Sequence, residues 1–293
     1  MKYQGLYTAI VTPFKNGVVD YDAYKALIEA QIAGGVDGIV PMGTTGESPT
    51  VSTEEHLEII RKCVEFVAGR CQVIAGTGAN STAEAIEMTK AAAAMGVDGT
   101  LQVCPYYNKP NQEGVYQHFK AIAEATDLPI MLYSIPGRSG IEIAVDTVAR
   151  LAADCPTIVA LKEAGGSVER VNQLVQALPA DFAILSGDDG LTVPFISCGA
   201  VGLVSVTSNV APAEMKALVD AAMSGDGKKA LEMQKKYYPL MKGLMSLDVN
   251  PVPAKAALAL RGDISWEIRL PLVPLAEEKH GKLTDLLKSF NLL

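Results

Sequence analysis

Short apolar runs recur along the chain about every 25–35 residues, with more polar segments between them. This interval is roughly the length of one strand followed by one helix. We therefore predict eight strands, at residues 6–12, 38–42, 72–76, 99–104, 129–133, 157–161, 182–186 and 201–206.

The segments between these runs are typical of helices. After Asp20, apolar residues fall on one face at helical spacing, namely Tyr24, Leu27, Ile28 and Ile32. Two serine–glutamate pairs match the S/T-x-x-E capping box that begins a helix. They are Ser52 with Glu55 and Ser81 with Glu84.

About eight strand-then-helix units favour a (β/α)8 TIM barrel. An open doubly wound sheet is the alternative, but neither G-x-G-x-x-G nor a P-loop follows the first predicted strand. Beyond about residue 212 the strand pattern stops, and segments 213–225, 228–245 and 253–262 are typical of helices. We therefore predict a catalytic barrel over 1–224 and a C-terminal helical domain over 225–293.

Composition narrows the class of protein. The formal net charge of −8 disfavours binding to nucleic acid or to an anionic membrane surface. No apolar stretch approaches the roughly 18 residues that span a bilayer, and the first residues do not resemble a signal peptide. Five scattered cysteines without a C-x-x-C pair indicate free thiols and a cytoplasmic protein. Only three histidines are present, so we expect no metal site. We also expect that the protein uses no cofactor.

Unusual polar residues follow several predicted strands. GTTGES (43–48), PYYNKP (105–110), YSIPGR (133–138) and GDD (187–189) each come directly after one, and Lys162 follows the apolar run 157–161. In a (β/α)8 barrel, the carboxyl ends of the strands carry the active site. We therefore expect these residues to meet on one rim.

Lys162 has two interpretations. It either caps a strand and pairs with a carboxylate such as Glu163, or it is an amine nucleophile that forms a Schiff base with a ketone. The second role requires a neutral amine, and thus a pKa lowered from roughly 10.4. An apolar strand before Lys162 and a cation such as Arg138 on a neighbouring loop favour that change.

The other rim residues also have alternatives. Thr44 and Thr45 between glycines suit a small carboxylate or phosphate, or form a plain polar turn. Tyr107 and Tyr133 relay protons or simply pack. Arg138 clamps a carboxylate or lies on the surface. For Asp188 and Asp189 we prefer a turn to a metal site. Together the rim suits a keto acid held by its carboxylate while its carbonyl reacts with Lys162.

The chain resembles the dihydrodipicolinate synthase family, within the pyruvate-dependent Schiff-base aldolase superfamily that also includes N-acetylneuraminate lyase. The resemblance covers essentially the whole chain and rests on ordered motifs: AIVTPF, GTTGES, VIAGTGAN, PYYNKPNQEG, YSIPGRSG, IVALKEA, LSGDD, VSVTSNV and NPVPAK. It implies a TIM barrel that condenses pyruvate with L-aspartate 4-semialdehyde to 4-hydroxy-tetrahydrodipicolinate. That reaction is the first committed step of lysine (diaminopimelate) biosynthesis.

The resemblance also implies a role for each matching residue. Lys162 forms the imine, Tyr133 is the general acid/base, and Thr44 links Tyr133 to Tyr107, which the family inserts from a neighbouring subunit. Arg138 binds the carboxylate of the semialdehyde. Thr45, Gly187 and Val204 complete the pyruvate pocket. Ser134 stands where the family usually has Asn, and we expect only a minor effect.

A second site follows from the resemblance. Family members that L-lysine inhibits bind it at a dimer interface, through positions that match Ser48, His56, Asn80, Glu84 and Tyr106. We therefore expect feedback inhibition by lysine in a homotetramer built as a dimer of dimers. Pro49 and Thr53 are less usual in that region and leave the affinity for lysine open.

Three rival functions remain open at this point. A lyase acting on a sugar-derived keto acid shares the lysine and the first tyrosine but lacks the arginine that Arg138 provides here. A silent barrel that senses a keto acid has no need of a nucleophile. A phosphate-binding barrel requires a glycine-rich cradle after the last two strands, which the sequence lacks.

Overall fold

Eight parallel strands close into a barrel in the computed structural model, which describes residues 2–293. The strands follow one another in the order β1-β10-β9-β8-β7-β6-β5-β4, with β4 returning to β1. Their bounds are β1 (Gly5–Ala9), β4 (Gly38–Val40), β5 (Gln72–Gly76), β6 (Gly99–Val103), β7 (Ile130–Ser134), β8 (Ile158–Glu163), β9 (Ala183–Ser186) and β10 (Gly202–Ser205). The predicted (β/α)8 barrel and its eight strands are confirmed.

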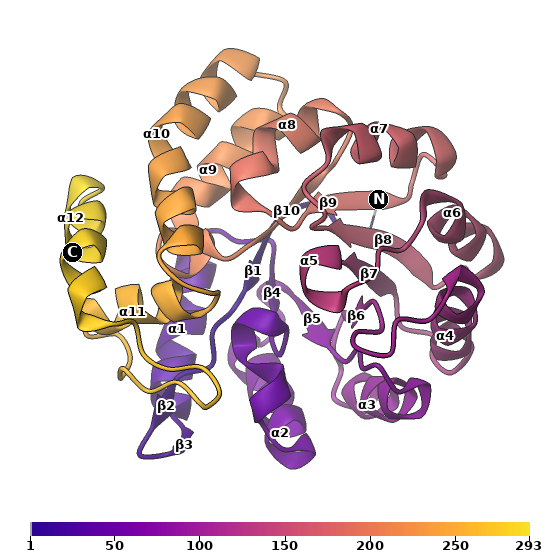
Figure 1. The fold of residues 1–293 in the computed structure, drawn as a ribbon, viewed down its shortest axis with the longest axis horizontal. Helices are drawn as coiled ribbons and strands as arrows, with labels where there is room; N and C mark the ends of the chain where they lie inside the picture. The colour runs from indigo at the N-terminus through magenta and orange to yellow at the C-terminus, as the bar shows by residue number, and fades with distance from the viewer. Residues whose placement is uncertain (1) are drawn as a thin grey trace.

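A helix follows each barrel strand, and the helices form the outer layer around the sheet (Figure 1). They are α1 (Tyr21–Ala33), α2 (Thr53–Val67), α3 (Thr82–Ala94), α4 (Gln112–Glu124), α6 (Val145–Asp154), α7 (Val168–Ala177), α8 (Thr192–Ser197) and α9 (Pro212–Met223). Ser52 and Glu55 form a complete capping box at the start of α2. At α3, the Ser81 hydroxyl accepts the Glu84 N–H at 3.4 Å, which is half of the predicted box.

Three further helices follow the barrel: α10 (Gly227–Ser246), α11 (Val252–Leu260) and α12 (Glu277–Ser289). Figure 1 shows α11 and α12 in yellow, on the side of the barrel that carries α1. The helical appendage is confirmed, although α12 was not among the predicted helices. One apolar cluster contains residues of α1, α2, α9, α10, α11 and α12. The proposed division at 224/225 stays a prediction.

The first strand is shorter than predicted. Its ladder ends at Ala9, although Ile10 and Val11 remain buried. The Val11 N–H donates to the Asn209 side chain (3.0 Å) from the 3-10 turn η4 (Thr207–Asn209) instead of to a strand. A small antiparallel hairpin, β2 (Phe14–Lys15) and β3 (Val18–Val19), then leads to α1. The hairpin was not predicted because two-residue strands leave no periodic pattern.

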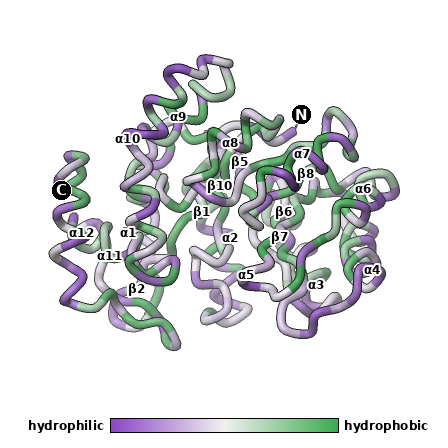
Figure 2. Tube along the Cα trace, turned by 45° about the horizontal axis from the view of Figure 1, so that its top comes forward, coloured by the Kyte–Doolittle hydropathy of each residue, from purple (hydrophilic) through white to green (hydrophobic). Residues whose placement is uncertain are grey.

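Apolar side chains fill both the inside of the barrel and the layer between strands and helices. The interior holds residues such as Tyr7, Met131, Ala160 and Val204. Figure 2 shows hydrophobic residues concentrated along the strands and hydrophilic residues on the outer turns of the helices. Because side chains alternate along a strand, every second residue of β8 points into the barrel. Ala160 and Lys162 therefore share the inner face.

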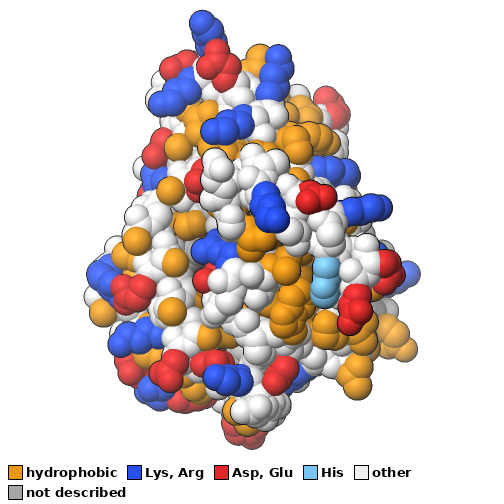
Figure 3. Space-filling model, turned by 90° about the vertical axis from the view of Figure 1, so that its left-hand side faces the viewer, with side chains coloured by type: hydrophobic (Ala, Val, Ile, Leu, Met, Phe, Trp, Pro, Cys, Tyr) orange, Lys and Arg blue, Asp and Glu red, His pale blue; other side chains and the backbone are white. Residues whose placement is uncertain are grey.

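The face that carries the C-terminal helices mixes charges of both signs with scattered apolar side chains (Figure 3). The C-terminal part of the chain exposes several large apolar residues, including Val249, Trp266, Leu270 and Val273. Among residues 2–293, no helix combines the length and the apolar character needed to cross a membrane.

Candidate functional site

Lys162 lies at the carboxyl end of β8 with its side chain inside the barrel. The residue is only 6% exposed. Tyr133 on β7 is its register partner across the two strands, and the Lys162 Nζ lies 4.1 Å from the centre of the Tyr133 ring. The amine is therefore enclosed by a phenol and by the apolar barrel interior, and Glu163, the carboxylate considered as its partner, pairs with Arg170 instead.

Gly187 follows β9 and lies directly against Lys162. A Cβ at this position would come within 2.7 Å of the Ala164 Cβ and 3.1 Å of the Lys162 Cε. The Gly187 N–H donates to the Glu163 carbonyl (2.7 Å), which fixes this close approach. Val204 on β10 is 1% exposed in the same interior cluster as Tyr133. A side chain at position 187 would collide with Ala164 and Lys162, so the close packing around Lys162 requires glycine there.

Behind Lys162, the Glu163 side chain points out of the barrel and is completely buried. It accepts hydrogen bonds from the Arg170 Nε (2.9 Å) and the Gly165 N–H (2.7 Å). Arg170, on the following helix α7, also donates to the Ile143 carbonyl. Burial raises the pKa of Glu163, and the Arg170 guanidinium opposes that shift. This ion pair ties the end of β8 to α7.

The turn after β4 contains Thr44 and Thr45. It consists of the 3-10 turns η1 (Thr44–Gly46) and η2 (Ser48–Thr50), joined at Glu47. Thr45 is buried, and its hydroxyl accepts a hydrogen bond from the Asn250 side-chain amide (3.0 Å). Thr44 is partly exposed. Two hydroxyls thus lie on a compact turn, as a carboxylate-binding site requires.

Arg138 reaches the same region from α5 (Pro136–Ser139), after β7. Its guanidinium donates to the Asn250 carbonyl (3.2 Å). Asn250 therefore contacts two groups that the sequence analysis assigned to two different carboxylates. A guanidinium is suited to bind a carboxylate because its donors match the two oxygens.

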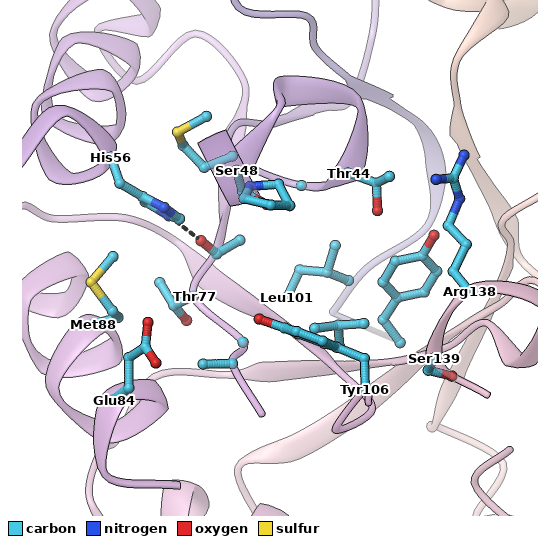
Figure 4. A pocket seen from close by; sticks show the side chains of 18 of the residues that line it. Thr44, Ser48, His56, Thr77, Glu84, Met88, Leu101, Tyr106, Arg138 and Ser139 are labelled. Atoms are coloured by element: carbon cyan, nitrogen blue, oxygen red, sulfur yellow. Dashed lines mark hydrogen bonds between the residues drawn. The ribbon is translucent and has the colours of Figure 1, made fainter. Parts of the chain in front are cut away.

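A cavity of about 430 Å³ opens between these elements (Figure 4). Thr44 and Arg138 lie at one end, and Tyr133 also lines the cavity. His56 and Glu84 lie at the other end, and Tyr106 crosses the space between. The remaining wall includes Ser48, Pro49, Thr53, Gly76, Thr77, Met88, Leu101 and Val103. The structure thus brings part of the predicted catalytic set and most of the predicted lysine-binding set to one hollow.

At the His56 end of the cavity, burial shifts the pKa values of two side chains. The His56 Nε2 lies 2.7 Å from the Gly76 carbonyl, and burial lowers the pKa of His56. A neutral imidazole therefore faces the cavity as a hydrogen-bonding group at neutral pH. Burial, together with the nearby Glu84, raises the pKa of Tyr106. Asn80 does not line the cavity; its amide donates to the Tyr106 carbonyl (3.1 Å).

Several predicted residues lie outside the cavity wall: Lys162, Thr45, Gly187, Val204 and Tyr107. The first four are next to it in the barrel end, as described above. Tyr107 is 89% exposed, with a φ of 72° in the left-handed region. Within this single chain it does not meet Thr44 or Tyr133. Its predicted role depends on a neighbouring subunit.

Asp188 and Asp189 form a turn, as predicted. Asp188 caps the 3-10 turn η3 (Asp189–Leu191), and the buried Asp189 accepts N–H groups of Val206 (3.0 Å) and Thr207 (3.3 Å). Asp189 thereby links the loops after β9 and β10. Within residues 2–293, no cluster of three or more His, Cys, Asp or Glu side chains is arranged to hold a metal ion. Ser134 is buried, and its hydroxyl accepts the Ile143 N–H (3.4 Å).

Four residues that hold the Thr44–Thr45 turn were not predicted to do so: Glu47, Asn250, Lys255 and Arg269. Two signals were available. Glu47 lies within GTTGES, and Lys255 is the only charged residue of the otherwise apolar helix α11. A single charge in an apolar helix indicates a buried partner, but the sequence does not say which residue that partner is.

Comparisons with known proteins agree on one family. Residues 2–290 match the model of the dihydrodipicolinate synthetase family. A 4-hydroxy-tetrahydrodipicolinate synthase of Syntrophus aciditrophicus is 50% identical over 291 residues, 99% of each chain. A solved structure of that enzyme from Methylacidiphilum fumariolicum SolV is 54% identical, with a TM-score of 0.97 over 99% of this chain and 96% of that chain. A lysine-bound structure from Cyanidioschyzon merolae is 45% identical, with a TM-score of 0.96 over 100% and 99% of the two chains.

Proposed function

This chain belongs to the dihydrodipicolinate synthetase family, and on that premise we propose that it condenses pyruvate with L-aspartate 4-semialdehyde through a Schiff base on Lys162. The chain is an enzyme of this family. The product is 4-hydroxy-tetrahydrodipicolinate, and the reaction opens the diaminopimelate route to lysine. One observation carries the proposal: the enclosed Lys162 amine lies 4.1 Å from the ring of Tyr133, beside the cavity that Thr44 and Arg138 line.

In the first step, the neutral Lys162 amine adds to C2 of pyruvate, and the keto oxygen leaves as water. The hydroxyls of Thr44 and Thr45 hold the pyruvate carboxylate during this step. Tyr133 moves the protons, because its phenol belongs to the ring packed against Lys162. Loss of a proton from C3 then gives the enamine.

In the second step, C3 of the enamine attacks the aldehyde carbon of the semialdehyde. Arg138 holds the carboxylate of that substrate, which orients the aldehyde toward the enamine. The substrate amine then adds to C2 as Lys162 leaves, and the ring closes. One water is released overall, and the Lys162 amine is regenerated.

We also propose that the enzyme works as a homotetramer built from two dimers. The support is the position of Tyr107, 89% exposed and held at a positive φ on a loop away from the cavity. A neighbouring copy that inserts this phenol completes the proton path through Thr44 to Tyr133. Analytical ultracentrifugation of the wild type and of Tyr107→Phe tests the proposal: an active wild-type monomer contradicts it.

A cytoplasmic location remains part of the proposal. All five cysteines lie within residues 2–293 and are free thiols there. Unpaired, mostly buried thiols are typical of proteins from a reducing compartment. Cell fractionation tests the location directly.

The reaction is tested by measuring pyruvate consumption with three acceptors: L-aspartate 4-semialdehyde, N-acetylmannosamine and D-glyceraldehyde. We expect turnover with the semialdehyde alone. Consumption with a sugar aldehyde instead assigns the chain to the sugar-acid aldolases and removes the proposed role of Arg138. In a separate experiment, we expect borohydride treatment in the presence of pyruvate to trap a reduced adduct, which mass spectrometry locates at Lys162.

We propose that L-lysine inhibits the enzyme at the His56 end of the cavity, through Ser48, His56, Asn80, Glu84 and Tyr106. The lysine-bound relative from Cyanidioschyzon merolae supports this assignment. The Glu84 carboxylate faces the cavity and suits the ammonium of the ligand (Figure 4). His56→Lys places a second ammonium there, so we expect loss of lysine inhibition with little change in kcat. Unchanged inhibition contradicts this site.

A further inference from the structure

We propose that the buried ion pair between Glu47 and Lys255 positions the Thr44–Thr45 turn to receive the carboxylate of pyruvate, an inference that rests on the function proposed above. Glu47 ends the turn, and Lys255 lies on α11, 208 residues further along the chain. Neither residue contacts the reacting atoms. Both act through the position of the two threonines.

Glu47 fixes the conformation of the turn. Its N–H donates to the Thr44 carbonyl (3.1 Å), and its φ of 60° lies in the left-handed region. A residue with a Cβ occupies that region only when its surroundings hold it there. The placement of the Glu47 side chain therefore determines where the turn that carries Thr44 and Thr45 ends.

Lys255 and Arg269 hold this side chain from the C-terminal part of the chain. The Lys255 Nζ lies 2.5 Å from the Glu47 Oε1, and the Arg269 backbone N–H donates to the Glu47 Oε2 (3.0 Å). Glu47 is 2% and Lys255 is 4% exposed. Burial lowers the pKa of Lys255, and Glu47 opposes that shift. Because an unpaired charge is very unfavourable in such a site, the pair permits one arrangement.

The same C-terminal segment also contacts the turn at a second point. Asn250, two residues before α11 begins at Val252, donates its side-chain amide to the Thr45 hydroxyl (3.0 Å). The segment from Asn250 to Lys255 thus contacts both a threonine of the turn and the residue that ends it. Stability alone does not require charges here, since an apolar pair of similar volume often packs as well. A charged, hydrogen-bonded pair also fixes the orientation of the Glu47 side chain, because hydrogen bonds depend on angle as well as distance.

The test compares the KM for pyruvate, kcat and thermal unfolding in the full-length enzyme. Lys255→Met leaves the Glu47 carboxylate buried without its cation. The double variant Glu47→Leu with Lys255→Met restores an apolar, packed contact. Glu47→Gln keeps the shape and one acceptor oxygen but removes the charge. Lys279→Met is the matched control, because Lys279 pairs with Asp248 in the same C-terminal region without contacting the turn.

We expect the KM for pyruvate to rise about tenfold in Lys255→Met and in the double variant, with kcat changed less than about threefold. The double variant recovers part of the unfolding temperature lost in Lys255→Met, because the Arg269 N–H still lacks its Glu47 acceptor, and it does not recover the KM. Glu47→Gln raises the KM about threefold and folds normally. Lys279→Met matches the wild type in all three quantities.

A wild-type KM in the double variant or in Glu47→Gln contradicts the positioning role. The Glu47–Lys255 pair would then contribute to the stability of the fold alone. Failure of the proposed function has a different signature. In that case the wild type itself does not form a borohydride-trapped adduct with pyruvate. If Lys255→Met does not fold, the double variant and Glu47→Gln decide the matter through the KM.

Discussion

The two halves of the candidate site are held in place by buried ion pairs that span very different lengths of the chain. At the end of β8, the Glu163 carboxylate behind Lys162 binds Arg170, only seven residues further along the chain. At the turn after β4, Glu47 binds Lys255 across 208 residues. Both are buried ion pairs between a carboxylate and a cation. They differ in where the cation comes from.

This difference separates the part of the site that one strand–helix unit builds from the part that needs the whole chain. Lys162 and Arg170 belong to β8 and α7, which are adjacent in sequence and in the barrel. The turn that carries Thr44 and Thr45 is held by Asn250, Lys255 and Arg269, all from the C-terminal part of the chain. We therefore expect substitutions in the C-terminal helices to weaken pyruvate binding more than they disturb the surroundings of Lys162.

The largest expected effect comes from removing the nucleophile of the β8 half. Lys162→Ala eliminates the amine that forms the imine, and we expect kcat to fall by about 10⁴-fold, because no other group supplies the covalent step. The measurements are steady-state rates and borohydride trapping with pyruvate. Lys235→Ala, at an exposed position on α10, is the control and keeps wild-type rates. A trapped adduct at another residue in the Lys162→Ala variant contradicts the assignment.

The ion pair between Glu163 and Arg170 is tested by Arg170→Met. This change leaves Glu163 buried without its cation, and breaking one partner of such a pair typically lowers the free energy of unfolding by about 3–5 kcal/mol. We expect a loss of about 3 kcal/mol in urea-induced unfolding. Arg61→Met serves as control; it removes two exposed ion pairs on α2, to Glu58 and Glu65, and 47% of the arginine side chain is accessible. It changes the same quantity by less than about 1 kcal/mol. Equal losses in the two variants contradict the comparison.

The local half of the site was the more predictable from sequence. An apolar run that ends in a single lysine is visible in 157–162, and the spacing of such runs indicates the barrel and the rim where Lys162 lies. Gly187 and Arg138 follow predicted strands for the same reason. Their functional roles came from the resemblance of ordered motifs, because residue types alone left a strand cap, a polar turn and a surface arginine equally open.

The half of the site at the Thr44–Thr45 turn, which residues far along the chain hold in place, was not predictable in the same way. The charges of Glu47 and Lys255 are visible in the sequence, but nothing local pairs residues 208 positions apart. Helix α12 was missed because 277–289 is rich in charged residues and shows little apolar pattern. The hairpin at 14–19 is too short to have a period. Contacts that depend on the closed barrel become visible only in the structure.

Gly187→Ala tests how tightly the β8 half is packed around the amine. The added Cβ would lie 2.7 Å from the Ala164 Cβ and 3.1 Å from the Lys162 Cε, so the lysine side chain or the backbone must shift. We expect kcat/KM for pyruvate to fall about 100-fold, since a displacement near 1 Å is sufficient for such a loss. Gly227→Ala, with no atom within 4 Å of an added Cβ, is the control. Normal kinetics in Gly187→Ala show that the contact is not required.

The smallest effect concerns the pH dependence of the distant half. A bidentate hydrogen bond from the Arg269 guanidinium lowers the pKa of Glu55 to about 2. Arg269 also donates to Glu47 through its backbone and to the Thr50 carbonyl through its side chain. The Glu55–Arg269 pair thus supports the residue that completes the brace on Glu47.

The direction of the pH effect follows from that lowered pKa. A carboxyl whose folded pKa lies below its unfolded value of 4.5 stabilises the protein fully above about pH 5, and the contribution disappears as the pH falls toward 2. Because the Glu55 side chain is 35% exposed, solvent screening limits the effect to about 1 kcal/mol. We expect Glu55→Gln to unfold in less urea than the wild type at pH 7, with the difference narrowing by pH 3.5. The exposed Glu87→Gln variant on α3 is the control. If the difference in unfolding between the two proteins stays constant or widens in acid, the Glu55 charge has no such role. The pH-sensitive link between α2 and the Arg269–Glu47 contact is then contradicted.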